Sequence, residues 1–232
     1  MVTLIRHGQA GSRLAYDDLS EIGREQAQAL GKWFGARRVR FDAVIVGGLN
    51  RQQLTASHML GAMRDSSAPQ PPLTVDSRWN EFDLDEVYAG IGPLLAREDE
   101  QFHLEYEQLK LESADPASSA HRAWRKCDVA VVRAWIAGRF EFAGESFAGL
   151  TARVHEALAA LPKSGHVAVV TSATPIGISI GTALEISPKH VMRLAAGYNS
   201  AFSELDIRPE GIWVRSFNNV PHLDAERLRT LR

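Results

Sequence analysis

The chain of 232 residues is 45% hydrophobic and 23% charged, with a formal net charge of −2, which argues against a nucleic-acid-binding or disordered protein. Its single cysteine, Cys127, excludes an intramolecular disulfide and is typical of a reducing compartment. The first strand is expected from residue 2, which leaves no room for a signal peptide, and no apolar run is long enough to span a bilayer. We therefore expect a cytoplasmic protein that binds neither a membrane nor nucleic acid.

The first third of the chain predicts strands that alternate with helices. Short apolar runs at residues 2–5 and 41–46 are typical of buried strands, and a weaker strand is expected at 73–75. A helix should begin after Ser20, whose hydroxyl is a good N-cap, and another is expected over 50–63. This alternation favours a parallel sheet, because parallel strands need a crossover helix between them.

A region of a different kind follows. Strand signals are poor over 84–143, where Cys127, Val131 and Trp135 recur at helical spacing, so we expect a helical insertion. The remaining expected elements are a helix over 144–161, a strand over 166–171, a helix over 175–184 and paired strands over 198–207 and 211–217. Together the elements predict an α/β protein, a three-layer α/β/α sandwich with a mostly parallel central sheet. No linker or repeat stands out, so we expect a single domain over 1–232 that contains the insertion.

The most informative stretch is Arg6-His7-Gly8, which follows the first strand directly. In open α/β sheets, ligands bind at the carboxyl ends of the strands, so this strand would deliver both side chains to a ligand-binding edge. An arginine there can bind an anion, and a histidine can act as a nucleophile. The tripeptide alone is a weak signal, because roughly a few per cent of chains this long should contain it by chance.

Other motifs supply the context that the tripeptide needs. In chain order they are Arg6-His7-Gly8, Leu19-Ser20-Glu21-Ile22-Gly23-Arg24-Glu25-Gln26-Ala27, Gly48-Leu49-Asn50-Arg51-Gln52-Gln53-Leu54-Thr55-Ala56, Asn80-Glu81 and Gly144-Glu145-Ser146. In these segments and in this order, the sequence resembles the histidine phosphatase superfamily, the phosphoglycerate mutase-like proteins. The resemblance runs nearly from end to end, and it implies that the insertion covers a pocket for a phosphate ester.

The resemblance implies catalytic roles for four residues: His7, Arg6, Arg51 and Glu81. The same roles follow from the chemistry of the side chains. Arginines bind a phosphate dianion through planar, bidentate donors, so Arg6 and Arg51 would hold the phosphoryl group. A neutral imidazole at His7 can attack phosphorus, and Glu81 can give the leaving oxygen a proton. Taken singly, Arg51 is better explained as a solvated helix residue and Glu81 as a loop carboxylate, and only the joint pattern favours the site.

The resemblance also implies a second histidine after the last core strand, where this sequence has Ala173. In the family that histidine donates to the transferring phosphoryl group, and losing one such donor costs about 10²–10³ in rate by analogy with oxyanion holes. Hydroxyls of Ser172, Thr174 or Ser12 are candidates to replace the donor at the phosphate. Three outcomes remain open: slow turnover, a partly replaced donor, or phosphate binding without turnover.

We therefore expect a phosphatase that hydrolyses a small-molecule phosphate ester through a phosphohistidine, slowly or atypically because the second histidine is absent. A catalytically inactive member that binds a phosphate ligand or a protein is the alternative, and a phosphoglycerate mutase is a weaker one. The remaining histidines show no metal-ligand spacing, so neither a metal nor another cofactor is expected. The oligomeric state stays open.

Overall fold

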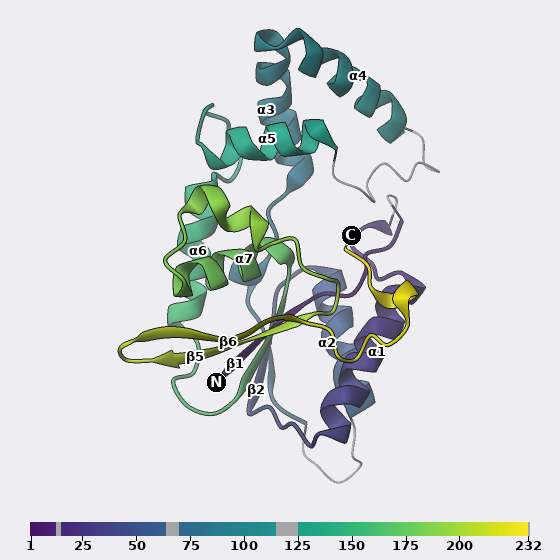
Figure 1. Ribbon diagram of the computed structural model, residues 1–232, viewed down its shortest axis with the longest axis vertical. Coiled ribbons are helices and arrows are strands. Elements are labelled where there is room, and N and C mark those ends of the chain that lie inside the picture. Colours follow the sequence, from purple (N-terminus) through teal and green to yellow (C-terminus); the bar gives the residue numbers. More distant parts are fainter. Residues whose placement is uncertain (13–14, 64–69, 115–124, 232) are drawn as a thin grey trace. The chain divides into compact units, whose positions relative to one another are not determined.

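The computed structural model describes residues 1–12, 15–63, 70–114 and 125–231. Within these residues it contains six strands and seven α-helices (Figure 1). The strands are β1 (Val2–Arg6), β2 (Ala43–Val46), β3 (Leu73–Val75), β4 (Val167–Thr171), β5 (Phe202–Arg208) and β6 (Gly211–Asn219). The helices are α1 (Glu21–Ala36), α2 (Asn50–Met63), α3 (Leu84–Glu98), α4 (Glu100–Ala114), α5 (Lys126–Ile136), α6 (Phe147–Ala159) and α7 (Ala173–Ala183).

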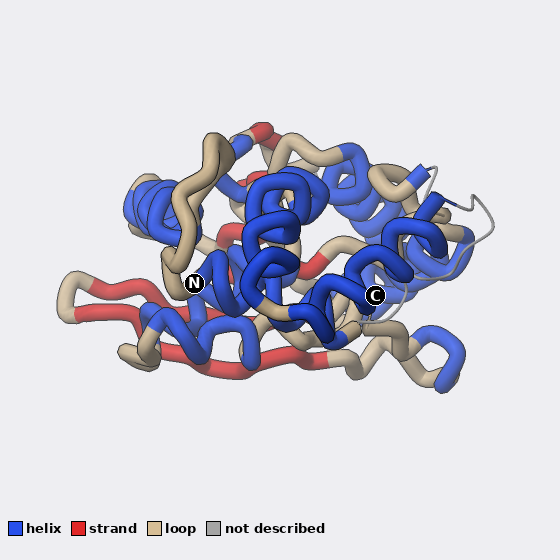
Figure 2. The backbone as a smooth tube through the Cα atoms, turned by 90° about the horizontal axis from the view of Figure 1, so that it is seen from above, coloured by secondary structure: helices blue, strands red, loops and turns tan. Residues whose placement is uncertain are grey.

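The strands form one mixed sheet in the order β3-β2-β4-β1-β5-β6. The strands β3, β2, β4 and β1 are parallel to one another, whereas β5 runs antiparallel to both β1 and β6. The predicted mostly parallel sheet is confirmed. Figures 1 and 2 show the β5–β6 hairpin extending at one side of the sheet. Arg6 pairs with Thr171 in the β1–β4 register, so the carboxyl ends of these two central strands meet at one edge.

Helices cover both faces of the sheet. Helices α1 and α2 pack side by side on one face, and α7 lies against β1 on the other (Figure 1). Strand β1 shows why two layers are needed, because neighbouring side chains point to opposite faces and both Leu4 and Ile5 are fully buried. The core under α1 and α2 contains Ile5, Leu30, Phe34, Phe41, Val44, Val46, Ala56, Met59, Leu60, Ala168, Val170 and Phe202. The predicted three-layer α/β/α sandwich is thus confirmed.

Local signals explain where two helices begin. Ser20 caps α1 as predicted, because its hydroxyl accepts a hydrogen bond from the backbone N–H of Gly23 at 3.0 Å. Helix α7 was expected from residue 175 but begins at Ala173. Pro175 fits inside this first turn because the backbone N–H that proline lacks has no intrahelical partner there. The earlier start places Ala173 and Thr174 directly at the sheet edge.

The chain divides into two compact units, each with its own packing. The first comprises Met1–Glu81 with Arg153–Arg232 and contains the sheet, and the second comprises Phe82–Ala152. In the second unit the rings of Phe82 and Trp135 stack with centroids 4.4 Å apart, so aromatic side chains build a local core. This division does not decide whether the chain is a single domain with a lid over 84–143, which stays a prediction.

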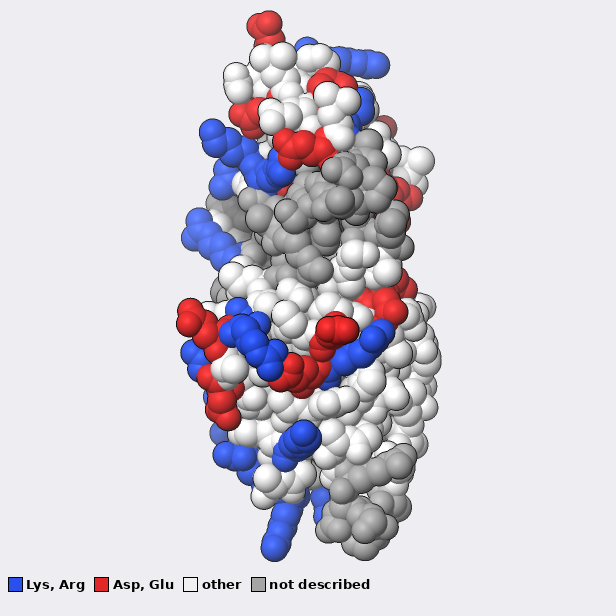
Figure 3. All heavy atoms as spheres, turned by 90° about the vertical axis from the view of Figure 1, so that its right-hand side faces the viewer, with Lys and Arg blue, Asp and Glu red and all other residues white. Residues whose placement is uncertain are grey.

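Charges of both signs are interspersed on the face of the molecule drawn in Figure 3. Exposed pairs such as Arg215 with Asp206, at 2.7 Å, stabilise the fold little because both partners remain hydrated. Among the described residues, no helix combines the length and the apolar character needed to cross a bilayer.

Candidate active site

His7 lies at the carboxyl edge of the sheet, directly after β1. Its backbone N–H donates to the carbonyl of Thr171 at 2.9 Å, which extends the pairing of β1 with β4 by one residue. Its carbonyl accepts from the backbone N–H of Ser200 at 3.2 Å and from the side-chain amide of Asn199 at 3.4 Å. The residue is only 6% exposed. The histidine backbone is therefore fixed by the end of β4 on one side and by the turn before β5 on the other.

The contact from Ser200 depends on a turn where the sequence predicts a strand. A strand was expected from residue 198, but β5 begins at Phe202. Ser200 has a φ of 56°, in the left-handed region that non-glycine residues seldom adopt. This turn aims both donors at the His7 carbonyl, which satisfies a buried acceptor beyond the end of β1.

The hydrogen bonds of the His7 ring determine its tautomer. Arg51 donates from Nε to Nε2 of His7 at 3.3 Å, and a guanidinium nitrogen can only donate. Nε2 must therefore carry a lone pair, and the ring proton of a neutral imidazole lies on Nδ1. Nδ1 is 2.7 Å from the carbonyl oxygen of Gly8, to which it donates. The structure thus presents Nε2, the nitrogen with the free lone pair, toward Arg51.

Burial keeps this imidazole neutral. It lowers the pKa of His7 well below its ordinary value of 6.5, and the nearby positive charges of Arg51 and Arg6 lower the pKa further. The hydrogen bond to the Gly8 carbonyl acts in the opposite direction and is outweighed. A neutral ring is what a nucleophile requires, because protonation would consume the Nε2 lone pair.

Gly8 brings the histidine close to the helices. A Cβ at Gly8 would lie 2.4 Å from the carbonyl oxygen of Gly23, so no larger residue fits here without a backbone shift. The Gly8 N–H donates to the hydroxyl of Thr55 at 3.0 Å, and that hydroxyl donates to the Arg51 carbonyl at 2.7 Å. The strand end and the first turn of α2 are thereby joined, which positions Arg51 against His7.

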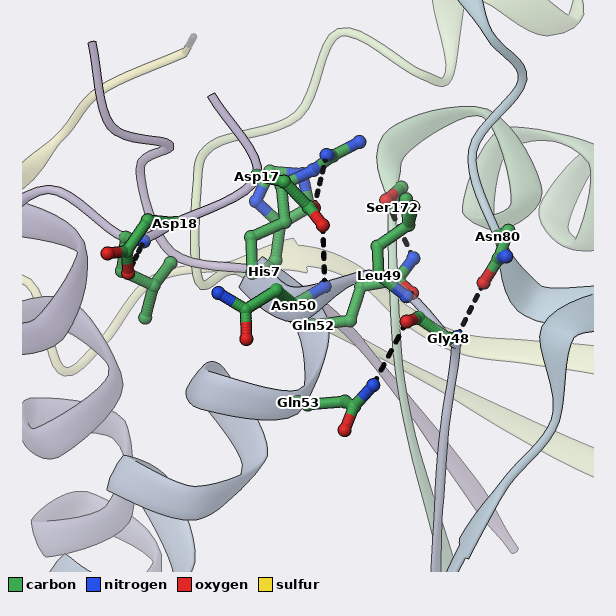
Figure 4. Close-up of polar contacts among 12 residues, drawn as sticks. His7, Asp17, Asp18, Gly48, Leu49, Asn50, Gln52, Gln53, Asn80 and Ser172 are labelled. Atoms are coloured by element: carbon green, nitrogen blue, oxygen red, sulfur yellow. Dashed lines mark hydrogen bonds and ion pairs between the residues drawn. The ribbon is translucent and has the colours of Figure 1, made fainter. Parts of the chain in front are cut away.

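Arg51 is buried at the start of α2, with 8% of the residue exposed, so it is not a solvated helix residue. Its Nη1 donates to Oδ1 of Asp17 at 2.8 Å, and Oδ2 of Asp17 accepts from the backbone N–H of Asn50 at 3.0 Å. Figure 4 shows the Asp17 carboxylate directed at the backbone of Asn50. The ring of Tyr16 lies 5.3 Å from the guanidinium carbon. Arg51, which was predicted to bind phosphate, is therefore already paired with an acid.

Arg6 occupies the last position of β1, one residue before His7. Its Nη1 donates to the carbonyl of Gly197. Arg6 and Ala173 border one pocket, whose other lining residues are Ile176, Leu194, Ala195, Gly197, Tyr198, Ala201, Ser203, Phe217 and Asn218. Ala173 therefore lies near Arg6 beyond the end of β4, while phosphate binding by either residue stays a prediction.

Glu81 reaches the sheet edge from the segment after β3. Its Oε2 accepts from the backbone N–H of Thr174 at 3.1 Å, in the first turn of α7, where a negative charge suits the helix dipole. Arg153 holds the preceding segment by donating to the carbonyls of Arg78 and Asn80, both at 2.8 Å. Glu81 is thus directed inward, although its role as proton donor stays a prediction.

The hydroxyls predicted at the phosphate have different surroundings. Ser172 is fully buried, and its oxygen accepts from Nε2 of Gln52 at 2.9 Å (Figure 4). Gln52 also donates to the carbonyl of Trp79, so it links α2 to the residue that follows β4 and to the segment between β3 and Glu81. Thr174 is 2% exposed, whereas Ser12 is exposed. Whether any of these hydroxyls reaches a phosphate stays a prediction.

The structure therefore places two pairs of the predicted residues in contact, His7 with Arg51 and Glu81 with Thr174. It also shows site residues that the sequence reasoning missed, above all Asp17. Asp17 precedes the α1 cap by a few residues, and nothing in local spacing connects it to a helix that begins at Asn50. Only an excess of positive charge in the predicted pocket was a signal that a counter-ion was needed. In the described residues, no three His, Cys, Asp or Glu side chains converge on a metal position.

His222 supports the turn that holds His7. Its Nε2 lies 2.9 Å from the hydroxyl of Ser200, and its Nδ1 has no hydrogen-bond partner among the described residues. Burial lowers the pKa of His222 from 6.5 to about 4, because a charged ring would leave a buried N–H unsatisfied.

The titration of His222 predicts a loss of stability in mild acid. The unfolded chain binds this proton near pH 6.5, whereas the folded chain binds it only near pH 4. The contribution of neutral His222 to the free energy of unfolding is therefore fully present above pH 6.5, and it is lost as the pH falls from 6.5 to 4. In His222→Gln, the loss of unfolding free energy between pH 7 and pH 5 should be smaller than in the wild type by about 2 kcal/mol. Urea unfolding at both pH values measures this, with exposed His103→Gln as control. An equal loss in wild type and His222→Gln would contradict the prediction.

The family described as "Histidine phosphatase superfamily (branch 1)" matches residues 2–220. The mitochondrial serine/threonine-protein phosphatase Pgam5 of Caenorhabditis briggsae is 24% identical over 239 aligned positions, which cover 98% of this chain. The alignment spans 65% of the length of that relative.

Solved structures share the fold at low sequence identity. YhfR of Bacillus stearothermophilus superposes with a TM-score of 0.66 at 17% identity, covering 97% of this chain and 100% of that protein. A mutant phosphoserine phosphatase from Entamoeba histolytica, in complex with phosphoserine, has a TM-score of 0.60 at 18% identity, covering 96% of this chain and 98% of that protein. At these identities the structures are informative about the fold alone.

Proposed function

The chain belongs to the histidine phosphatase superfamily, and on this basis we propose that it hydrolyses small phosphate esters in the cytoplasm through a phosphohistidine at His7. The observation that carries the proposal is the neutral His7 ring, with its Nε2 lone pair directed at the Arg51 guanidinium. Relatives named as phosphatases, including one that binds phosphoserine, support a phosphomonoester as the substrate class.

In the proposed reaction, the Nε2 lone pair of His7 forms a bond to phosphorus while the bond from phosphorus to the ester oxygen breaks. The leaving oxygen takes a proton from Glu81. Water then attacks the phosphohistidine, one of its protons passes to Glu81, and the N–P bond breaks to release inorganic phosphate. Arg6 and Arg51 balance the charge on the phosphoryl oxygens during both transfers.

The resting contact between Arg51 and His7 is compatible with this chemistry. At 3.3 Å, it is longer than a strong hydrogen bond, so an arriving phosphoryl group replaces it at small cost. The same guanidinium then donates to phosphoryl oxygens, which accept charge-assisted and therefore stronger bonds. The site needs no large rearrangement of His7, because its backbone is held by Thr171 and Ser200.

We propose that the reaction is slow or atypical because Ala173 stands where the family has its second histidine. The neighbouring hydroxyls of Thr174, Ser172 and Ser12 are candidates to supply part of the missing donation. The alternative, a member that binds phosphate ligands without turnover, is favoured by one observation: Arg51 is already paired with Asp17.

Rapid quenching of the protein during turnover of radiolabelled nitrophenyl phosphate tests the proposal. A phosphohistidine should leave the label on the protein in alkali and lose it in acid. Turnover without any labelled protein would contradict the covalent mechanism. Binding of phosphate with neither turnover nor label would favour the non-catalytic alternative.

Glu81→Gln is expected to slow alkyl phosphates far more than nitrophenyl phosphate. A proton donor matters most when the departing oxygen is strongly basic, and nitrophenolate leaves without help. We expect a decrease of about 10²–10³ in kcat for an alkyl phosphate and less than about tenfold for the nitrophenyl ester. Steady-state kinetics on both esters measures the difference, with exposed Glu21→Gln as control. Equal slowing of both esters would assign Glu81 to binding or structure.

A further inference from the structure

The anion-binding position at the start of α2 is filled by a side chain of the protein itself. The Asp17 carboxylate accepts from Nη1 of Arg51 with one oxygen and from the backbone N–H of Asn50 with the other (Figure 4). A guanidinium and a helix N-terminal N–H are also the donors that a phosphate prefers. Asp17 therefore accepts hydrogen bonds from the kinds of donor that a phosphoryl group would use.

The phosphoryl group and Asp17 need the same arginine. A phosphorus atom that is to be attacked must lie next to Nε2 of His7, and Nε of Arg51 is 3.3 Å from that nitrogen. The Asp17 oxygen lies 2.8 Å from Nη1 of the same guanidinium. A dianion at His7 would thus lie only a few ångströms from the negative charge of Asp17. The two charges would share Arg51, whose side chain is largely buried, so water screens their repulsion only weakly.

We propose that Asp17 is an internal competitor of the substrate: its carboxylate occupies the phosphate position on Arg51 until a phosphoryl dianion displaces it. The inference rests on the proposed function, because it assumes that the phosphoryl group binds at His7 and Arg51. It assigns Asp17 a part in ligand selection, since a ligand must bind Arg51 better than a carboxylate monoanion does. Phosphomonoester dianions meet that requirement, and singly charged esters do not.

The loop around Asp17 allows such an exchange. The Asp17 side chain is 51% exposed, so its carboxylate can turn into water without opening the core. The next residue is anchored: the carbonyl of Asp18 accepts from the N–H of Gly11, and its side chain pairs with Arg24. Displacement therefore requires rotation of one side chain while the loop base stays in place.

Titration of the full chain with inorganic phosphate at pH 8 tests the proposal. Asp17→Asn removes the charge and keeps an amide oxygen for the Asn50 N–H. It should bind phosphate about tenfold more tightly than the wild type, the scale expected for a partly exposed charge pair. The matched control is Asp224→Asn, which removes the same charge from an exposed residue on another segment and should bind as the wild type does. Urea midpoints show whether each variant is folded.

A double variant separates competition from a general charge effect. In an Arg51→Ala background, Asp17→Asn should no longer raise the affinity for phosphate, because the shared donor is absent. A persistent gain there, or unchanged or weaker binding in Asp17→Asn alone, would overturn the proposal. If no variant binds phosphate, both the competition and the proposed function fail. If phosphate binds as expected but no phosphohistidine forms, the competition stands and the catalytic function fails.

Discussion

His7→Ala is expected to lower kcat for nitrophenyl phosphate by about 10⁴-fold or more, as removal of the nucleophile does in other covalent enzymes. In the proposed mechanism the covalent step has no substitute, because it assigns the attack on phosphorus to the lone pair on Nε2 of His7. Binding should be affected much less, since Arg6 and Arg51 supply the positive charge. Steady-state kinetics with phosphate titration of the same sample measures both effects.

The controls for this variant follow from its burial. His166→Ala removes a partly buried histidine at the opposite end of β4, so it tests whether loss of any such ring reduces activity. Retained phosphate binding shows that His7→Ala still forms the pocket. Full activity of a folded His7→Ala protein would refute the phosphohistidine mechanism.

Ala173→His is expected to raise turnover of a generic phosphomonoester by up to about 10²–10³, the value of one restored donor to the phosphoryl oxygens. Ala173 is the first residue of α7, directly after β4, and it is only half-buried, so the substitution does not replace a fully buried core residue. The effect should appear in kcat, because the added donor acts on charge that develops in the transition state.

Two comparisons make this gain specific. Ala173→Leu adds a side chain of similar size without a donor and should give no gain. In a His7→Ala background the gain from Ala173→His should disappear, because the transition state needs the nucleophile. A folded Ala173→His protein without any gain would favour the non-catalytic alternative.

Motif positions translated directly into structure where the chain is locally regular. Ser20 caps its helix, and Arg6 and His7 end a central strand, because capping and strand ends depend on neighbouring residues. The sequence pattern was less informative at 198–201, where a strand was predicted and the chain forms a turn before β5. There Ser200 adopts a left-handed conformation that the His7 carbonyl and His222 stabilise, and neither partner is local in sequence.

The sequence by itself determined the order of the elements, the α/β class and the placement of Arg6 and His7 at the carboxyl edge. These follow from short-range periodicity and from the rule that strand ends deliver ligand-binding residues. Only the tertiary structure decided the tautomer of His7 and the pairing of Arg51 with Asp17. Both depend on distances between segments that no local pattern connects. A buried charge such as that of Arg51 needs a polar partner, and only the fold determines which residue lies close enough to be that partner.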